Sequence, residues 1–149
     1  MKKIILFITC LFCLVSCHII TQEEPVAENE KAYEAYGLLT IPSSGFTKDS
    51  LRVKIVEKED ATMDLYIFDV KFAAGMPVTI DMLVSGVGYA KSGSEIRFYG
   101  DSIVPTAGGK PYEKYIILDL EGKITADSIV LSNYYGKTPS TYAGKLFKK

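Results

Sequence analysis

From Tyr36 onward, apolar and polar residues alternate with the period of two that is typical of β-strands, and no helical spacing interrupts the pattern. Residues 51–57, 77–85 and 112–120 each place apolar side chains on one face and charged or hydroxyl side chains on the other. Residues 62–72 are apolar on both faces over part of their length, which predicts a central strand covered on both sides. The body of the chain is therefore predicted to be all-β.

Turn-forming residues, including the glycine-containing segments 86–93 and 121–123, divide this pattern into eight predicted strands. These strands are 36–41, 51–58, 62–72, 77–85, 94–100, 111–120, 124–132 and 139–147. Short connections favour an up-and-down order, and eight antiparallel strands can close into a barrel without exposed edges. We therefore predict an eight-stranded antiparallel β-barrel over residues 35–149. A barrel of this size is either filled by its own side chains or holds one small ligand.

The N-terminus has a different pattern. Lys2 and Lys3 precede an apolar run over residues 4–15. This run is too short for a transmembrane helix, which needs about 20 residues, but it suits the apolar region of a signal peptide. Residues 14–17 (LVSC) resemble the lipobox of bacterial lipoproteins, which implies cleavage before Cys17. The Cys17 thiol would then carry a diacylglycerol, and its amine a further acyl chain such as palmitate. The alternatives are a plain signal peptide or a buried N-terminal helix.

Residues 17–34 contain five glutamates and one proline, and no strand pattern continues beyond Ile20. Such a segment is predicted to be a solvated, acidic tether. The predicted organisation is thus a signal peptide over 1–16, a lipidated tether over 17–34 and a barrel over 35–149. The protein is expected in the cell envelope, anchored by lipid to the outer membrane, on a face that the sequence leaves open.

Without residues 1–16, the chain has 133 residues with 15 basic and 18 acidic side chains, a net charge of −3. It has no basic stripe to neutralise phosphates, so nucleic acid is not an expected partner. Cys10 and Cys13 leave with the signal peptide and Cys17 is used for the lipid, so no internal disulfide can form.

The single histidine is His18, beside the predicted anchor, and the predicted barrel therefore contains neither His nor Cys. This excludes Ser-His-Asp and Cys-His catalytic arrangements and zinc sites ligated by His or Cys. We expect no catalytic residue, metal or cofactor. Carboxylates remain, and a glycosidase needs only two of them. Asp69, Asp81 and Asp101 lie in or beside apolar sequence, but no spacing marks a pair, which favours places on polar strand faces or at turns.

The chain has ten tyrosines and no tryptophan. Tyrosine combines an apolar ring with a polar tip, so tyrosines at strand ends could line a barrel mouth and stack on a sugar or another planar ligand. The alternative is the ordinary strand propensity of tyrosine. The residues concerned are Tyr89, Tyr99, Tyr112, Tyr115, Tyr134 and Tyr135. Gly108-Gly109-Lys110 lacks the phosphate-loop pattern and is predicted to be a hairpin turn.

Several stretches are similar to the calycin-like (lipocalin-like) β-barrel lipoproteins of gut bacteria. They are residues 70–82 (VKFAAGMPVTIDM), 100–105 (GDSIVP), 107–115 (AGGKPYEKY), 124–131 (ITADSIVL) and 142–146 (YAGKL). The similarity covers most of residues 36–145 and implies a lipocalin-like barrel on a lipid tether. It implies no catalytic or ligand residues for this chain. The chain also lacks the Gly-x-Trp signature of true lipocalins, because it has no Trp.

The sequence leaves three hypotheses about function. The first is a lipid-anchored barrel that binds a small apolar or amphipathic ligand at one open end, which requires space inside the barrel. The second is a non-enzymatic structural or interaction lipoprotein that binds a protein or glycan on its outer surface, which predicts a filled barrel and an exposed apolar patch. The third is a hydrolase based on carboxylates.

Overall fold

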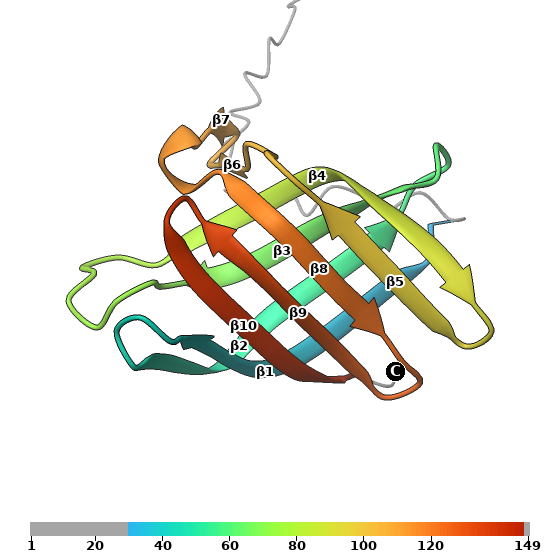
Figure 1. Cartoon of the computed structure of the whole chain (residues 1–149), viewed down its shortest axis with the longest axis horizontal. Coiled ribbons are helices and arrows are strands. Elements are labelled where there is room, and N and C mark those ends of the chain that lie inside the picture. Colours follow the sequence, from blue (N-terminus) through green and yellow to red (C-terminus); the bar gives the residue numbers. More distant parts are fainter. Residues whose placement is uncertain (1–29, 148–149) are drawn as a thin grey trace, which may run out of the picture.

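The computed structural model describes residues 30–147 of the 149-residue chain, and the predictions for the signal peptide, Cys17 and most of the tether lie outside these residues. Residues 30–147 form a closed antiparallel barrel of eight strands (Figure 1). The strands are β1 (Ala32–Ile41), β2 (Phe46–Glu57), β3 (Thr62–Val70), β4 (Ile80–Ser92), β5 (Glu95–Gly100), β8 (Ile117–Ile124), β9 (Ser128–Tyr135) and β10 (Thr138–Leu146). Each pairs with the next along the chain, and β1 closes the barrel by pairing with β10. The predicted all-β, up-and-down barrel is confirmed.

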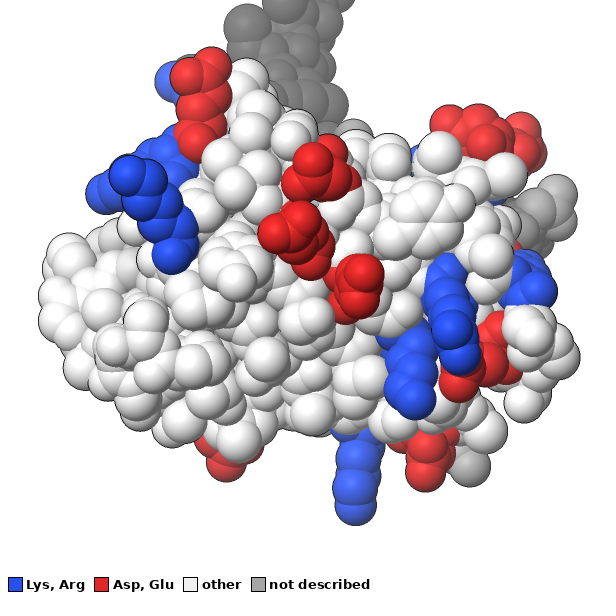
Figure 2. Space-filling view, viewed as in Figure 1, with Lys and Arg blue, Asp and Glu red and all other residues white. Residues whose placement is uncertain are grey.

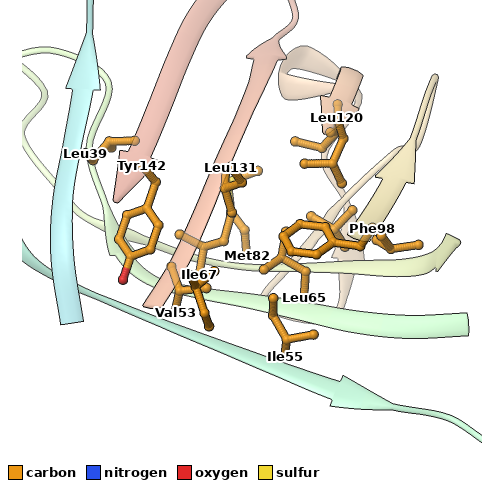
Figure 3. Close-up of a cluster of buried hydrophobic side chains, with 14 of the residues drawn as sticks. Leu39, Val53, Ile55, Leu65, Ile67, Met82, Phe98, Leu120, Leu131 and Tyr142 are labelled. Atoms are coloured by element: carbon orange, nitrogen blue, oxygen red, sulfur yellow. The ribbon is translucent and has the colours of Figure 1, made fainter. Parts of the chain in front are cut away.

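The interior is filled by one cluster of apolar side chains that come from all eight strands of the barrel. Figure 3 shows side chains such as Val53 and Ile67 pointing toward Leu131 on the opposite wall. Phe98 lies over Gly122 of the neighbouring strand, and a Cβ atom at Gly122 would collide with the Phe98 ring. A filled interior of this kind stabilises the barrel mainly by removing apolar surface from water.

The connection from β5 to β8 helps to close one end of the barrel. It contains a small hairpin of β6 (Thr106–Ala107) and β7 (Lys110–Pro111), then a 3-10 helix, η1 (Glu113–Tyr115). The Phe72 ring centroid lies 4.4 Å from the ring centroids of Tyr115 and Tyr135. The ring centroids of Tyr112 and Tyr115 are 5.0 Å apart. These four residues are hereafter the aromatic plug. Offset aromatic pairs at these distances pack favourably.

The first and last described residues lie at the opposite end of the barrel from the aromatic plug. There the Phe147 N–H donates to the carbonyl oxygen of Glu34, at 2.7 Å. No helix within residues 30–147 is long and apolar enough to span a membrane.

Two predicted turns are wrong, because Gly86 and Gly122 lie within strands and do not end them. The strand predicted over 77–85 runs over Ile80–Ser92, since Gly86 has a φ of +76° and forms a bulge where the pairing of β3 with β4 shifts register. Residues 121–123 lie inside β8, where Gly122 makes room for Phe98. The strands predicted over 111–120 and 124–132 are accordingly displaced toward the C-terminus.

The barrel also begins earlier than predicted. β1 starts at Ala32, so the last residues of the segment 17–34 belong to a strand rather than to the tether. Glu34 points outward and accepts a hydrogen bond from Nε of Arg52 on β2, at 2.8 Å. An acidic residue on the outer face of a strand has the same sequence pattern as an acidic residue in a tether.

The second covering layer predicted over residues 62–72 consists of side chains and not of another strand. Tyr66 and Phe68 lie half-buried on the outside of β3, and no other strand of residues 30–147 forms a layer over them. The Arg52 guanidinium lies 4.4 Å from the Phe68 ring centroid, and Lys54 Nζ lies 5.8 Å from that of Tyr66. Cationic side chains on β2 therefore cover these rings, through cation–π contacts.

Candidate functional site

A groove of about 800 Å³ crosses the outside of five neighbouring strands, in the order β1, β10, β9, β8 and β5. Its volume falls within the range of about 300–1,000 Å³ that is typical of ligand sites. The groove is lined by Leu38, Thr40, Arg97, Phe98, Tyr99, Glu121, Gly122, Lys123, Val130, Leu131, Ser132, Thr141, Tyr142 and Ala143. Four of them, at positions 98, 122, 131 and 142, alternate along the strands with the outward-facing residues and belong to the inner face. The outward-facing residues therefore define the chemistry of the groove.

The outward-facing residues form two rows, because antiparallel pairing aligns them across the strands. The apolar row begins at the β1 end and finishes with two cations: Leu38, Ala143, Val130, Lys123 and Arg97, each directly opposite the next. Neighbouring strands lie about 4.8 Å apart, so five strands give a row about 19 Å long.

The second row, the hydroxyl row, lies beside the first and also crosses all five strands. It consists of Thr40, Thr141, Ser132, Glu121 and Tyr99, again each opposite the next. A second hollow of about 430 Å³ adjoins it, with Pro42, Asp119, Tyr134 and Pro139 among its lining residues. The two hollows share Glu121, Ser132 and Thr141, so they form one continuous depression.

Exposed aromatic and aliphatic side chains concentrate on this side of the barrel. The large apolar residues exposed in the described part of the chain number seven, and five lie on these strands or beside them: Tyr36, Leu38, Tyr99, Tyr134 and Phe147. Tyr99 is 56% exposed and Tyr134 is 42% exposed. Figure 2 shows a broad uncharged area on this side, bordered by acidic and by basic side chains. The second hypothesis predicted an exposed apolar patch; this face instead combines exposed apolar side chains with hydroxyl-bearing ones.

Gly88 of β4 holds Tyr99 in place. The two residues are directly opposite each other, and a Cβ atom at Gly88 would lie 2.8 Å from Cε2 of the Tyr99 ring. The ring therefore rests against the backbone of β4, which orders an exposed side chain that would otherwise be free to rotate.

The charges at the β5 end of the groove are largely balanced. Arg97 Nε donates to Glu95 Oε1 at 2.7 Å, and Lys123 Nζ lies 4.0 Å from Glu95 Oε2. The hydrogen bond from Arg97 lowers the pKa of Glu95 below its ordinary value. The side chain of Glu121 makes no hydrogen bond or ion pair within residues 30–147, so its carboxylate is available to a ligand.

The three aspartates named from sequence do not lie in the groove, and two of them stabilise β-bulges. Asp69 has a φ of +52°, and its N–H donates to Asp81 Oδ1 at 2.7 Å. Asp119 has a φ of +48°, and its N–H donates to Asp101 Oδ1 at 3.1 Å. The backbone N–H of Asp119 and the Ser102 hydroxyl lower the pKa of Asp101. All three candidates are exposed, which agrees with places on polar strand faces.

The structure separates the six tyrosines that could have lined one barrel mouth. Tyr112, Tyr115 and Tyr135 belong to the aromatic plug, whereas Tyr99 and Tyr134 lie on the outside. Tyr89 lies toward the other end, where its hydroxyl donates to Glu57 Oε2 at 3.4 Å. The tyrosines that a ligand can reach in the groove are therefore on the outer wall of the barrel.

Glu57 forms the centre of a polar cluster near the end of the barrel opposite the aromatic plug. It accepts hydrogen bonds from the Tyr33 hydroxyl at 2.7 Å and from Lys91 Nζ at 2.6 Å. Partial burial alone would raise the pKa of Glu57, but the hydrogen bonds from Lys91 and Tyr33 outweigh it and hold the pKa below its ordinary value. Burial and the contact with Glu57 raise the pKa of Tyr33. This cluster has the features of a structural ion pair.

Within residues 30–147, no group of three or more His, Cys, Asp or Glu side chains is placed to hold a metal ion. Cys17 lies outside the described residues, so its lipidation stays a prediction. No family model, curated protein or solved structure matches the chain. The closed eight-stranded barrel is consistent with a calycin-like fold and is compatible with ligand binding.

Proposed function

We propose that this chain is a lipid-anchored, non-enzymatic binding protein of the cell envelope, which binds its ligand in the groove on the outside of the barrel. One observation carries the proposal: the interior is filled by apolar side chains from all eight strands, while a groove of about 800 Å³ lies outside. This arrangement favours the outer surface over the interior as the place where a ligand binds.

The alternative of a small apolar ligand inside the barrel has less support. Large side chains such as Phe98, Leu131 and Tyr142 occupy the interior, and the aromatic plug lies across one end. A ligand there would have to displace well-packed side chains, which costs free energy because protein interiors are close-packed.

The envelope location rests on residues 1–17 alone. Replacing Cys17 with Ala and fractionating the cells tests it, since several acyl chains hold a protein on a membrane durably. The wild type should remain in the membrane pellet and the variant should leave it. Equal retention of both would contradict the lipid anchor.

The binding site is tested by blocking the groove. Ala143 is exposed in the middle of the apolar row, so Ala143→Arg places a long side chain across the groove without touching the core. The matched control is Ser85→Arg, because Ser85 is exposed on β4 and lies outside the groove. The full-length proteins are purified gently from their own host and compared by native mass spectrometry. A bound mass present in wild type and control but absent from Ala143→Arg supports the groove, and a mass that persists in Ala143→Arg contradicts it.

A further inference from the structure

We propose that the groove binds an uncharged oligosaccharide chain that lies across the strands; this inference rests on the proposed function, because it names the ligand class of the same site. The outward-facing lining residues alternate between two chemistries in adjacent rows, one apolar and one rich in hydroxyls. A sugar ring has the matching character, with C–H groups on its faces and hydroxyls around its edge.

The hydroxyl row supplies the polar half of the match. Thr40, Thr141 and Ser132 lie directly opposite one another on β1, β10 and β9. A hydroxyl group can donate one hydrogen bond and accept two, so it can pair with a sugar hydroxyl in either orientation. The strand spacing of about 4.8 Å is comparable with the length of one pyranose unit in an extended chain. A chain laid across the strands would therefore meet a new strand at each sugar.

The apolar half of the match comes from small side chains and from two tyrosines. The side chains of Ala143 and Val130 in the middle of the groove are small, so a flat sugar ring can approach the sheet closely. Tyr99 stands at the β5 end, fixed against Gly88, and Tyr134 lines the adjoining hollow. An exposed aromatic ring held in one orientation is a suitable surface for stacking a sugar ring, because little side-chain entropy is lost on binding.

The balance of charge indicates an uncharged chain. Arg97 and Lys123 both interact with Glu95, and the free carboxylate of Glu121 lies within the hydroxyl row, two residues before Lys123 on β8. An acidic polymer would meet Glu121 and, in the adjoining hollow, Asp119. Like charges brought together at a binding surface cost free energy, whereas a carboxylate accepts hydrogen bonds well from neutral sugar hydroxyls.

A protein partner fits this surface less well. The centre of a stable protein interface is normally fully buried and built from large anchors such as Trp, Tyr or Leu inserted into pockets. Here the centre of the groove consists of Ala143, Thr141, Ser132 and Val130, and the large side chains lie at its margins.

The test is isothermal titration calorimetry with the full-length protein in detergent micelles. The probes are maltoheptaose, cellohexaose, xylohexaose and hexa-N-acetylchitohexaose as uncharged chains, and hexagalacturonate as an anionic chain. At least one uncharged chain should bind, and Ala143→Arg should abolish that binding while Ser85→Arg retains it. Tyr99→Ala should weaken binding by about tenfold through loss of the stacked ring. Tyr99→Phe, and Tyr36→Ala outside the groove, should change affinity by less than about twofold.

Gly88→Ala separates the position of the Tyr99 ring from its presence. The added methyl group displaces the ring, so affinity should fall as in Tyr99→Ala although the tyrosine remains. Thermal unfolding of each variant verifies that the barrel is intact.

The inference is overturned if no uncharged chain binds, if only hexagalacturonate binds, or if Ala143→Arg leaves the affinity unchanged. The native mass spectrometry experiment distinguishes the two levels. If Ala143→Arg still removes a mass captured from the host, the groove remains the binding site and only the ligand class is wrong. If Ala143→Arg affects neither experiment, the proposed function fails as well.

Discussion

Gly122 provides a direct test of how tightly the barrel is packed. The residue lies inside β8 and faces the interior, where the Phe98 ring covers it. In Gly122→Ala, the new Cβ atom would collide with the ring and would lie 2.8 Å from the Val130 carbonyl oxygen. The ring can rotate away only into neighbouring core side chains, and the carbonyl belongs to the adjacent strand. The added methyl group therefore strains both the core and the sheet.

The expected cost combines two opposing contributions. Overpacking a core by one methyl group costs about 1–3 kcal/mol. Replacing Gly with Ala also restricts the unfolded chain, which returns about 0.4–1 kcal/mol. We therefore expect Gly122→Ala to lower the free energy of unfolding by about 1–2 kcal/mol. Gly75→Ala is the matched control, because a Cβ atom there has open space around it. It should be neutral or slightly stabilising.

Urea denaturation followed by far-ultraviolet circular dichroism measures these differences, in a chain shortened to begin at Glu30 so that the whole described barrel is retained. A second comparison isolates the ring: in a Phe98→Leu background, Gly122→Ala should cost about 1 kcal/mol less than in the wild type, since contacting residues couple by amounts of this size. Equal stability of Gly122→Ala and Gly75→Ala, or an unchanged cost without the Phe98 ring, would refute the packing described for the interior.

Three further predictions concern polar groups, each measured by the midpoint of thermal unfolding. Asp81→Ala should destabilise the barrel by up to about 1 kcal/mol, because the N–H of Asp69 loses its acceptor, whereas Asp81→Asn should retain most of the stability. Because the pKa of Glu57 is lowered on folding, its ionised carboxylate stabilises the barrel at pH values above the ordinary pKa of 4.5, and this stability is lost as the pH falls through the folded-state pKa. Glu57→Gln should flatten this dependence of the unfolding midpoint on pH, and an unchanged pH dependence would contradict the account. Ser140→Ala should cost about 1–3 kcal/mol by removing the donor to the buried Asn133 Oδ1. Because Asn133 Nδ2 has no hydrogen-bond partner within residues 30–147, adding Asn133→Leu should recover stability, and a further loss would oppose this account.

The alternation of apolar residues was sufficient to predict the fold, because inward-facing side chains must be apolar in a filled barrel. Leu51, Val53 and Ile55 show this pattern and all three are buried. Boundaries were harder, since a glycine within a strand has the same sequence as a glycine in a turn. Gly86 serves a bulge and Gly122 serves the packing of Phe98, and neither role is visible without the neighbouring strand.

The groove could not be predicted from the sequence for a related reason. Leu38, Ala143, Val130 and Lys123 become neighbours only through the register of three strand pairings. Small or hydroxyl-bearing residues on the outer face of a strand are ordinary, and no signal along the chain distinguishes them. Tyr99 was the exception, because aromatic residues near strand ends are recognisable candidates for a half-exposed site.

The pairing of β1 with β10 also has a consequence for the order in which the strands pair during folding. Ala35 lies opposite Leu146, so the barrel cannot close until β10 is available to pair with β1. Contacts between such distant residues slow folding, because the loop between them must be ordered first. The pairing of β1 with β10 is therefore expected to form late in folding, and a barrel that lacked β10 would expose two unpaired strand edges.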